Sequence, residues 1–315
     1  MMDTSTLAAI VDAVVRELDP SGAFAAARPG YRATEPEPAR RVGQARSLAA
    51  NGGERALGVD TTAATAIRAP GVMNPVAPEG LAAIMETTTA RIGVGRAGAR
   101  PRTAELLRFQ ADLAVTKDAL ERSVDPGLLA ELGLFSVRTM VEGGKEEYLR
   151  RPDLGRRLSE EAKRTLAERC VKRPSVQLCV GDGLSARAIE VNLRKIFPVI
   201  ESGCATAGLS FGTPFFVERC RVGAMNDIGD IVEPEVLILL IGERPGLGRA
   251  DSMSAYMGYR PRSGLSDADR DVVCNIFDGG GVNPLEAGAY VLRLARSMIA
   301  AKASGVKLKM AEGNR

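Results

Sequence analysis

The 315-residue sequence contains no histidine and no tryptophan. Histidine is the commonest acid–base side chain near neutral pH and a frequent metal ligand. Its absence argues against a Ser-His-Asp triad, a zinc hydrolase site and a Cys-His nucleophile within this chain. No pair of carboxylates stands at a defined spacing either. We therefore predict no catalytic residue and no metal site in this chain.

Cysteine is scarce and shows no metal-binding pattern. The five cysteines include no Cys-x-x-Cys pair; they are Cys170, Cys179, Cys204, Cys220 and Cys274. An odd number of scattered cysteines indicates reduced thiols in a cytoplasmic protein. No apolar run reaches roughly 18 residues, and the N-terminus lacks the basic and apolar regions of an export signal. We therefore expect neither a membrane span nor export.

The charges almost balance, with 42 basic and 39 acidic residues and a net charge of +3. Such a balance gives no reason to expect nucleic acid or an anionic membrane as a partner. Hydrophobic residues make up 45% of the chain, as is usual for globular proteins. The length allows two modest domains, each with its own core.

The first 78 residues differ in character from the rest. Apolar residues recur three and four apart between Leu7 and Leu18, which predicts an amphipathic helix over residues 5–18. Residues 20–78 are rich in Ala, Gly, Pro and Arg, and we interpret them as a flexible linker. Residues 1–19 therefore read as a docking or targeting helix. The alternative is a helix that packs on its own subunit or on a neighbour.

Residues 79–150 are expected to form a smaller helical domain. Thr103 is the expected N-cap of a long helix with a broad apolar stripe. The stripe includes Leu106, Leu107, Phe109, Leu113 and Leu120. Four arginines precede this helix among glycines; they are Arg91, Arg96, Arg100 and Arg102. They form either an anion-binding or partner-binding loop, or a solvated loop or subunit contact.

From residue 151 to residue 315 the pattern alternates between helix and strand. Helices are predicted after Asp153, after Ser185, over residues 227–232 and after Asn283, with Gly305 ending the last. Strands are predicted at 176–180, 215–217, 236–241 and 272–277. The order predicts an α/β fold, a Rossmann-like three-layer sandwich with a mostly parallel sheet, preceded by the smaller helical domain.

A glycine-containing turn, Gly181 to Ser185, connects the first of these strands to its helix. A complete GxGxxG fingerprint is absent because Arg187 and Ala188 occupy the region of the third glycine. The turn instead suggests a helix N-terminus that presents amides to a polar part of a ligand. Asp182 and Ser185 are weaker candidates for such contacts, with helix capping as the alternative.

The stretch from Glu235 to Leu294 organises the C-terminal half. Its apolar run, Val236 to Ile241, predicts a strand buried on both faces, with Glu243 at its carboxyl end. Ligands bind at that edge of open α/β sheets. Glu243 is therefore a candidate ligand contact, and the plain alternative is a surface carboxylate paired with Arg244 or Arg260. Tyr256 and Tyr259 are expected to pack in the core or at a subunit interface.

Several segments between residues 81 and 310 resemble the small subunit of ethanolamine ammonia-lyase. The later segments read GERPGLG, SMSAYMGYRPR, DRDVVCNI and NPLEAGAYVLRLARSMIAAKASGV. The earlier ones read RIGVGRAGARPRTAELLRFQADLAVTKDA, YLRRPDLGRRLSEEA, VGDGLSARAIEVN and GTPFFVERCRV. The resemblance implies an adenosylcobalamin-dependent enzyme that converts ethanolamine to acetaldehyde and ammonia. It implies that a large TIM-barrel subunit holds the substrate and the catalytic residues.

The resemblance also implies three cofactor contacts in this chain. Val222 in FFVERCRV and Glu243 in GERPG match two corrin-contacting positions of the family, and Val272 matches the third. The family often has cysteine at the third position, whereas this chain has its cysteine at Cys274. That departure favours a backbone or packing contact at Val272. The chain also lacks the DxHxxG motif of some B12 proteins, which fits a base-on cofactor that keeps its own dimethylbenzimidazole.

The family implies assembly with the large subunit as six heterodimers, with the cofactor shared between the two chains. Its N-terminal extension can direct the enzyme into a bacterial microcompartment. Two other interpretations stay open at this point. One is a stand-alone Rossmann-like nucleotide-binding enzyme, and the other is a non-catalytic microcompartment adaptor that relies on the N-terminal helix.

Overall fold

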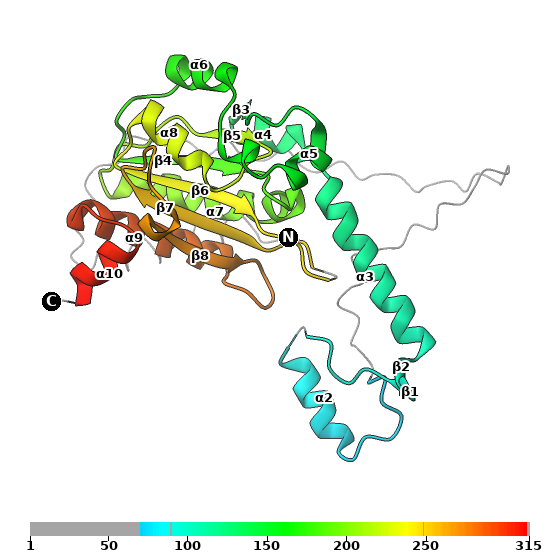
Figure 1. Cartoon of the computed structure of the whole chain (residues 1–315). Helices are drawn as coiled ribbons and strands as arrows, with labels where there is room; N and C mark the ends of the chain where they lie inside the picture. Colours follow the sequence, from blue (N-terminus) through cyan, green and yellow to red (C-terminus); the bar gives the residue numbers. More distant parts are fainter. Residues whose placement is uncertain (1–69, 89, 248, 314–315) are drawn as a thin grey trace, which may run out of the picture.

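The computed structural model describes residues 70–313 except Thr89 and Gly248. The predicted helix over residues 5–18, the segment 1–19 and most of the segment 20–78 lie outside the described residues. Figure 1 shows a compact α/β domain from which a long helix extends toward a smaller helical unit.

A six-stranded mixed sheet forms the centre of the α/β domain. Its strands are β3 (Phe135–Arg138), β4 (Val176–Gly181), β5 (Phe215–Glu218), β6 (Val236–Gly242), β7 (Met253–Tyr259) and β8 (Arg270–Ile276), in the spatial order β3-β5-β4-β6-β7-β8. The first four strands in that order are parallel, and β7 and β8 extend the sheet in antiparallel fashion. The predicted α/β class is confirmed. The sequence missed β3, which lies in the segment 79–150 that was expected to be helical, and it missed β7 and its antiparallel pairing with β6.

Helices cover both faces of the sheet. The helices α7 (Ala186–Thr206) and α9 (Pro284–Ala301) pack on one face, while α6 (Glu160–Arg169) and α8 (Ala224–Val232) pack on the other. The apolar run of β6 is continuous because both faces of this strand are buried. Val236, Ile238 and Leu240 enter the α7–α9 core, and Leu237, Leu239 and Ile241 enter the α6–α8 core. Every residue of β6 is buried, as the sequence predicted.

Several helix boundaries differ from the prediction. Thr103 is the first residue of α3 and Arg102 takes the N-cap position, while α8 begins at Ala224 instead of Asp227.

The helix expected after Asp153 begins at Glu160, because Ser159 caps it by accepting a hydrogen bond from the Ala162 N–H over 3.1 Å. Asp153 instead pairs with Arg151, and a short 3₁₀ turn, η2 (Leu154–Arg156), follows it.

The C-terminal helix likewise ends earlier than expected. Lys302, with φ 52°, ends α9 after Ala301, and Gly305 precedes a further helix, α10 (Val306–Gly313). At its start, Asn283 caps α9 and Pro284 is its first residue, as predicted.

The order in which strands join the sheet reverses at β4, because β5 is added on one side of β4 and β6 on the other. After β4 it runs through α7 on one face to β5, and after β5 it returns through α8 on the other face to β6. The loops that follow β4 and β5 therefore leave for opposite faces. Ligands bind at such a point, outside the carboxyl ends of the strands.

Residues 70–121 form an extension that we call the arm. It contains α2 (Pro78–Glu86), a short hairpin of β1 (Arg96–Ala97) and β2 (Arg100–Pro101), and α3 (Thr103–Glu121). In Figure 1, α3 (blue-green) leads from the α/β domain to this outer part. Residues between the arm and β4 belong to the α/β domain. They form α4 (Pro126–Glu131), whose Leu128 enters the α7–α9 core, then β3, and α5 (Gly144–Arg150).

Candidate functional site

Glu243 directly follows β6 and is held firmly at the carboxyl edge of the sheet. Its carboxylate accepts hydrogen bonds from the Ser252 hydroxyl over 2.6 Å, from the Ser254 hydroxyl, and from the Asn275 backbone N–H over 3.0 Å. These donors stand at the start of β7 and near the end of β8. They replace the arginine partner that the sequence suggested as the plain alternative. The charge of Glu243 is therefore fixed in position beside the antiparallel strands.

The neighbouring strand β8 exposes a partly apolar surface. Tyr256 stands opposite Val272 in the β7–β8 register. Because side chains two apart in a strand share a face, Cys274 points to the same side as Val272. Val272 is 47% exposed and Cys274 is exposed, while Tyr256 packs at the margin of the α6–α8 core. Tyr256, Val272 and Cys274 therefore lie on the same face of the sheet as α8. Val272 and Cys274 belong to β8, the strand at the edge of the sheet.

Glu243 lies on this same side of the sheet. Burial raises the pKa of Tyr256, and the nearby carboxylate of Glu243 raises it further. Alternation along the chain agrees, since Leu237, Leu239 and Ile241 all enter the α6–α8 core and Glu243 is next in that series.

Val222 lies in the loop between β5 and α8 and packs against the α6–α8 core. The strands β5, β4 and β6 are parallel neighbours, so their carboxyl ends meet at one edge. Val222 and Glu243 therefore stand at the same edge of the sheet. Val272 lies further along the same face, on β8.

The turn from Gly181 to Ser185 is packed tightly against the end of β6. Gly183, with φ +56°, lies so close to the Gly242 carbonyl oxygen that an added Cβ would overlap it. The Leu184 N–H donates to that same oxygen over 3.1 Å. Ser185 caps α7 by accepting from the Ala188 N–H, as the alternative interpretation expected, and donates to the Ala250 carbonyl oxygen. The Leu184 N–H and the Ser185 hydroxyl are thus both used by carbonyl oxygens of the protein.

Asp182 has a role that the sequence did not indicate. It does not cap α7; its carboxylate accepts from the Cys220 N–H over 2.9 Å and from Lys145 Nζ over 3.3 Å. It thereby ties the loop after β4 to the loop after β5. Lys145 lies 37 residues away in α5, so no local pattern could have shown this pairing.

Both tyrosines of β7 pack as predicted. Tyr256 packs against the α6–α8 core and Tyr259 against the α7–α9 core. Ser252 and Ser254 are the partners of Glu243 that the sequence analysis missed. Their spacing of two residues is the available signal, since it places both on one side of an extended chain.

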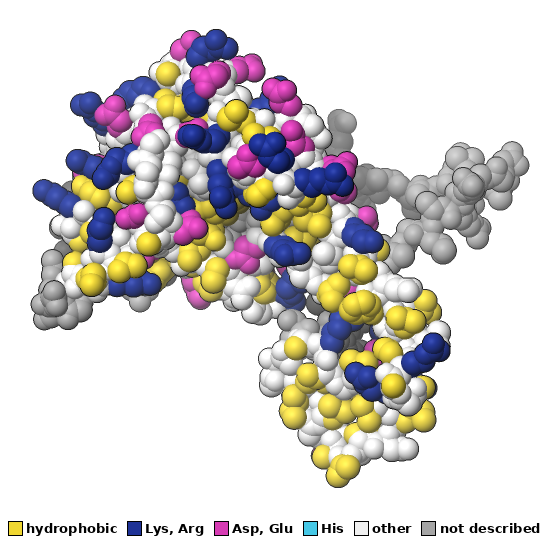
Figure 2. Space-filling model, in the orientation of Figure 1, with side chains coloured by type: hydrophobic (Ala, Val, Ile, Leu, Met, Phe, Trp, Pro, Cys, Tyr) yellow, Lys and Arg dark blue, Asp and Glu magenta, His cyan; other side chains and the backbone are white. Residues whose placement is uncertain are grey.

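The arm exposes apolar side chains instead of packing its predicted stripe. On α3, Leu107 is 59% exposed, and Leu106, Phe109 and Leu113 are exposed as well. Met73 and Ile84 add to this surface, and Figure 2 shows hydrophobic side chains gathered over the arm at the lower right. Large exposed apolar surfaces mark interaction sites.

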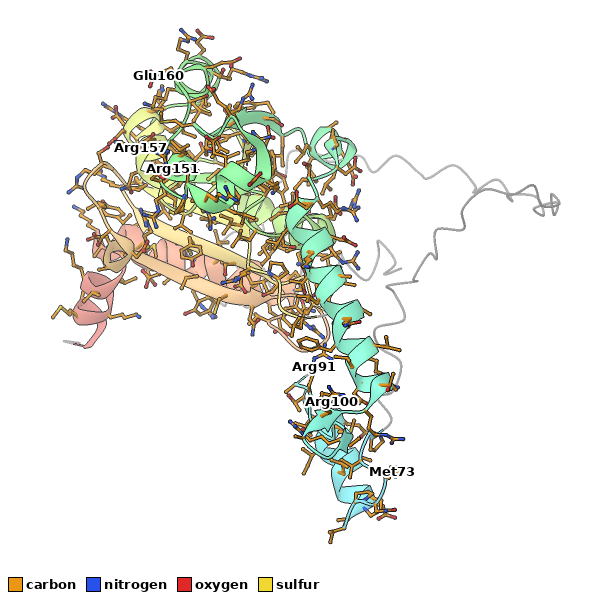
Figure 3. All side chains as sticks on the ribbon, turned by 45° about the vertical axis from the view of Figure 1, so that its right-hand side comes forward. Met73, Arg91, Arg100, Arg151, Arg157 and Glu160 are labelled. Atoms are coloured by element: carbon orange, nitrogen blue, oxygen red, sulfur yellow. The ribbon has the colours of Figure 1, made fainter. Side chains whose placement is uncertain are left out.

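The four arginines of the arm have different surroundings. Arg91 pairs with Asp112 and lies 5.4 Å from the centre of the Phe109 ring, and Arg102 donates to the Gly71 carbonyl oxygen. Figure 3 shows Arg91 and Arg100 in the arm, remote from Arg151 and Arg157 on the α/β domain. This placement favours the interpretation of the arginine segment as part of a contact surface on the arm.

The described residues also bear on membranes and metals. Among residues 70–313 as described, none of the helices is both long and apolar enough to span a bilayer. Within those same residues, no group of three or more cysteine, aspartate or glutamate side chains is placed to hold a metal ion.

Three features of the candidate site lie on the α8 side of the sheet. Glu243 supplies a positioned acceptor, Val272 supplies exposed apolar surface, and the Arg270 Nε atom on the same strand is buried without a hydrogen-bond partner among the described residues. These features define the class of the chain as an α/β protein with a fixed carboxylate at the carboxyl edge of its sheet.

Comparison with known sequences identifies the family. The ethanolamine ammonia-lyase light chain family matches residues 78–309. Similar curated proteins are named "Ethanolamine ammonia-lyase small subunit". The one from Clostridium perfringens is 44% identical over 238 residues, which are 76% of this chain and 80% of the relative.

Two further relatives carry the same name. The Fusobacterium nucleatum protein is 45% identical over 223 residues, or 71% of this chain and 75% of the relative. The Listeria monocytogenes protein is 43% identical over 238 residues, or 76% of this chain and 80% of the relative. The chain belongs to the family of ethanolamine ammonia-lyase small subunits, which form part of a B12-dependent lyase.

Proposed function

We propose that this chain clamps adenosylcobalamin against the large subunit of ethanolamine ammonia-lyase. Family membership implies a large-subunit partner and suggests adenosylcobalamin as the cofactor. When bound, the cofactor supplies the radical chemistry that converts ethanolamine to acetaldehyde and ammonia. The observation that carries the proposal is the fixed carboxylate of Glu243 beside the exposed side chains of β8.

Each of the three predicted residues has a distinct task in this proposal. A carboxylate offers about four acceptor positions. Three of those on Glu243 are used by Ser252, Ser254 and Asn275, so one is available to an amide or hydroxyl of the cofactor. Val272 packs against the corrin, and Val222 contacts it from the loop after β5.

The absence of histidine shapes the proposed binding mode. No residue of this chain can place an imidazole beneath the cobalt. We propose that the cofactor is bound base-on, with its own dimethylbenzimidazole as the lower ligand. The cofactor is then shared between the two chains, because this chain supplies contacts and the partner supplies the substrate site.

The large subunit also accounts for the apolar side chains that the arm exposes. We propose that the exposed apolar side chains of α3 are covered by the large subunit in the assembled enzyme. The family resemblance favours six heterodimers in that assembly. The sequence divided the chain into a smaller helical domain over residues 79–150 and a Rossmann-like three-layer domain over residues 151–315. Because β3 joins the sheet and Leu128 of α4 joins its core, we propose that the three-layer domain instead begins directly after the arm.

Reconstitution tests the proposed function. This chain and the large subunit are purified separately, and ammonia release from ethanolamine is measured with and without adenosylcobalamin. We expect release only when both chains and the cofactor are present. Release by the large subunit alone at the same rate, or binding of a nucleotide by this chain alone, would overturn the proposal.

Residues 1–19 are proposed to direct the enzyme into a microcompartment of a bacterial cytoplasm. The proposal draws on their predicted amphipathic helix and on the family resemblance. Deletion of these residues is expected to leave ammonia release intact and to change the location or solubility of the enzyme. A deletion that abolishes activity would show that the segment does more than dock.

The thiol of Cys274 reports on coverage of the β8 face. Of the five cysteines, Cys274 is exposed and the other four are buried. Burial raises the pKa of Cys170 to about 11 and that of Cys204 to about 12, so their thiolate forms are rare near neutral pH. We expect a maleimide to label Cys274 rapidly in the isolated chain and the other four only after unfolding.

The same labelling reaction tests the clamp. Addition of the large subunit and adenosylcobalamin is expected to slow labelling of Cys274 at least about tenfold, because access controls thiol reactivity. Labelling at an unchanged rate in the assembled, cofactor-loaded enzyme would show that this face stays open and would contradict the proposed contact at Val272.

A further inference from the structure

The loop that carries Val222 is anchored by a buried carboxylate. Asp182 is 2% exposed, and its Oδ1 atom accepts a hydrogen bond from the Cys220 N–H over 2.9 Å. The Arg219 N–H also hydrogen-bonds to this carboxylate. Arg219 adopts φ +57°, a conformation that L residues rarely take and that aims consecutive N–H groups at one anion. The backbone of residues 219–220 is therefore wrapped around Asp182.

The second oxygen of Asp182 accepts a hydrogen bond from Lys145. The Nζ–Oδ2 distance is 3.3 Å, and the lysine side chain is 11% exposed. The lysine nitrogen lies 5.4 Å from the centre of the Tyr148 ring. Burial raises the pKa of Asp182, and the positive charge of Lys145 opposes that shift. The pair is thus an internal ion pair with further hydrogen bonds from the backbone.

A second set of contacts holds the next residues of the same loop. The Tyr148 hydroxyl donates to the Cys220 carbonyl oxygen over 2.7 Å. The Arg221 guanidinium lies 4.2 Å from the centre of the Tyr148 ring and donates to the Tyr148 carbonyl oxygen over 3.2 Å. The Arg221 N–H donates to the Gly155 carbonyl oxygen over 2.8 Å. Residues of α5 and η2 therefore also hold this loop in place.

An ion pair of this kind is a poor source of stability. The cost of removing both charges from water offsets most of their attraction, so apolar replacements of such pairs are often neutral or stabilising. Its effect here is geometric, because it fixes two amides of one short loop. The residue two positions after Cys220 in that loop is Val222.

We propose that Asp182 and Lys145 are positioning residues that hold the segment Arg219–Gly223 so that Val222 meets the cobalamin. This inference rests on the proposed contact of Val222. Neither side chain touches the cofactor in this arrangement; they act through the backbone of Arg219 and Cys220. Ordering of the loop before binding reduces the entropy that binding would otherwise cost.

The test measures adenosylcobalamin binding to the complex of this chain with the large subunit. Asp182→Asn retains the size of the side chain but loses its charge and turns a donor toward Lys145. We expect its Kd for adenosylcobalamin to rise at least about tenfold, since hydrogen bonds to a buried charge contribute about a factor of ten or more. The KM for ethanolamine and kcat at saturating cofactor are expected to change less than about twofold.

Two variants of the lysine complete the series. Lys145→Met is expected to raise the same Kd and to speed hydrogen exchange in the segment 219–223, and Lys145→Arg is expected to restore part of the affinity. Arg151→Met is the matched control, because Arg151 forms an exposed ion pair with Asp153 near the same loop. The control is expected to leave the Kd unchanged. If Asp182→Asn fails to assemble, the Lys145 variants decide the matter by the same two measurements.

Val222→Asp separates this inference from the proposed function. If Val222→Asp raises the Kd while the Asp182 and Lys145 variants do not, the positioning role is overturned and the cofactor contact stands. If Val222→Asp leaves the Kd unchanged, the proposed contact and the positioning role both fail. A third outcome is that the Kd for adenosylcobalamin and the KM for ethanolamine rise together, thermal stability falls, and Lys145→Arg restores neither constant. The ion pair of Asp182 and Lys145 is then structural only, and the inference is overturned.

Discussion

Replacement of Glu243 by alanine is expected to raise the Kd of the assembled enzyme for adenosylcobalamin about 10- to 100-fold. A hydrogen bond to a charged group contributes about 1.5–3 kcal/mol, and each 1.4 kcal/mol is about a factor of ten. The substitution also leaves the Ser254 hydroxyl without its acceptor and the Ser252 hydroxyl with Asn275 Oδ1 alone, so the start of β7 loses its fixed geometry. Equilibrium dialysis of the complex measures the effect.

Two controls define the meaning of that result. Glu243→Gln keeps one acceptor oxygen and is expected to fall between the wild type and Glu243→Ala. Glu286→Ala removes an exposed carboxylate from the first turn of α9, on the other face of the sheet, and is expected to leave the Kd unchanged. The KM for ethanolamine should stay within about twofold throughout. Equal rises in both constants, or no rise in either, would contradict the role assigned to Glu243.

Placing a charge on α3 is expected to prevent assembly with the large subunit. Leu107 is 59% exposed on the arm, and Leu107→Glu puts a carboxylate into the surface that the partner is proposed to cover. Burial of an unpaired charge costs several kcal/mol, so the Kd for the large subunit should rise at least about 100-fold. Analytical ultracentrifugation of the mixed chains measures the association.

Met310 offers a matched control for the arm. It is an apolar residue on α10 that is 68% exposed, so Met310→Glu makes the same kind of change at a different place. The control is expected to assemble normally. Weak assembly of both variants would point to a general effect of added charge, and normal assembly of Leu107→Glu would remove the arm from the subunit contact.

The central strands were predictable because their signal is local. A continuous apolar run such as Val236 to Ile241 arises when both faces of a parallel strand are buried, and both faces of β6 are. β7 was missed because Ser254, Tyr256 and Gly258 interrupt the apolar residues. Its strand conformation depends on pairing with β6 and β8, which no short window of sequence contains.

The presence of a good N-cap residue is not enough to predict where a helix begins. Asp153 and Ser159 are both good N-cap residues, but Arg151 binds the carboxylate of Asp153. The two glutamates that follow Ser159 are the stronger signal of a helix start, since acidic residues favour the first turn. The apolar stripe of α3 was also visible, yet amphipathicity does not name what a helix packs against.

The candidate site was only partly predictable for a similar reason. The position of Glu243 at a strand end follows from the sequence, whereas its partners Ser252, Ser254 and Asn275 follow from the β6–β7–β8 register. The pairing of Asp182 with Lys145 depends on how α5 docks beside the loop after β4. Contacts between distant segments of this kind require the tertiary structure.

Hydrogen–deuterium exchange of the assembled enzyme, with and without adenosylcobalamin, tests the proposed cofactor clamp most directly. The cofactor is expected to slow exchange in three segments of this chain, namely residues 219–223, 243–246 and 270–275, and to leave α9 and α10 unchanged. Slowing in these three segments together would place the cofactor across the carboxyl edge and the β8 face. Unchanged exchange in all three, with slowing elsewhere in the chain, would contradict the proposed clamp.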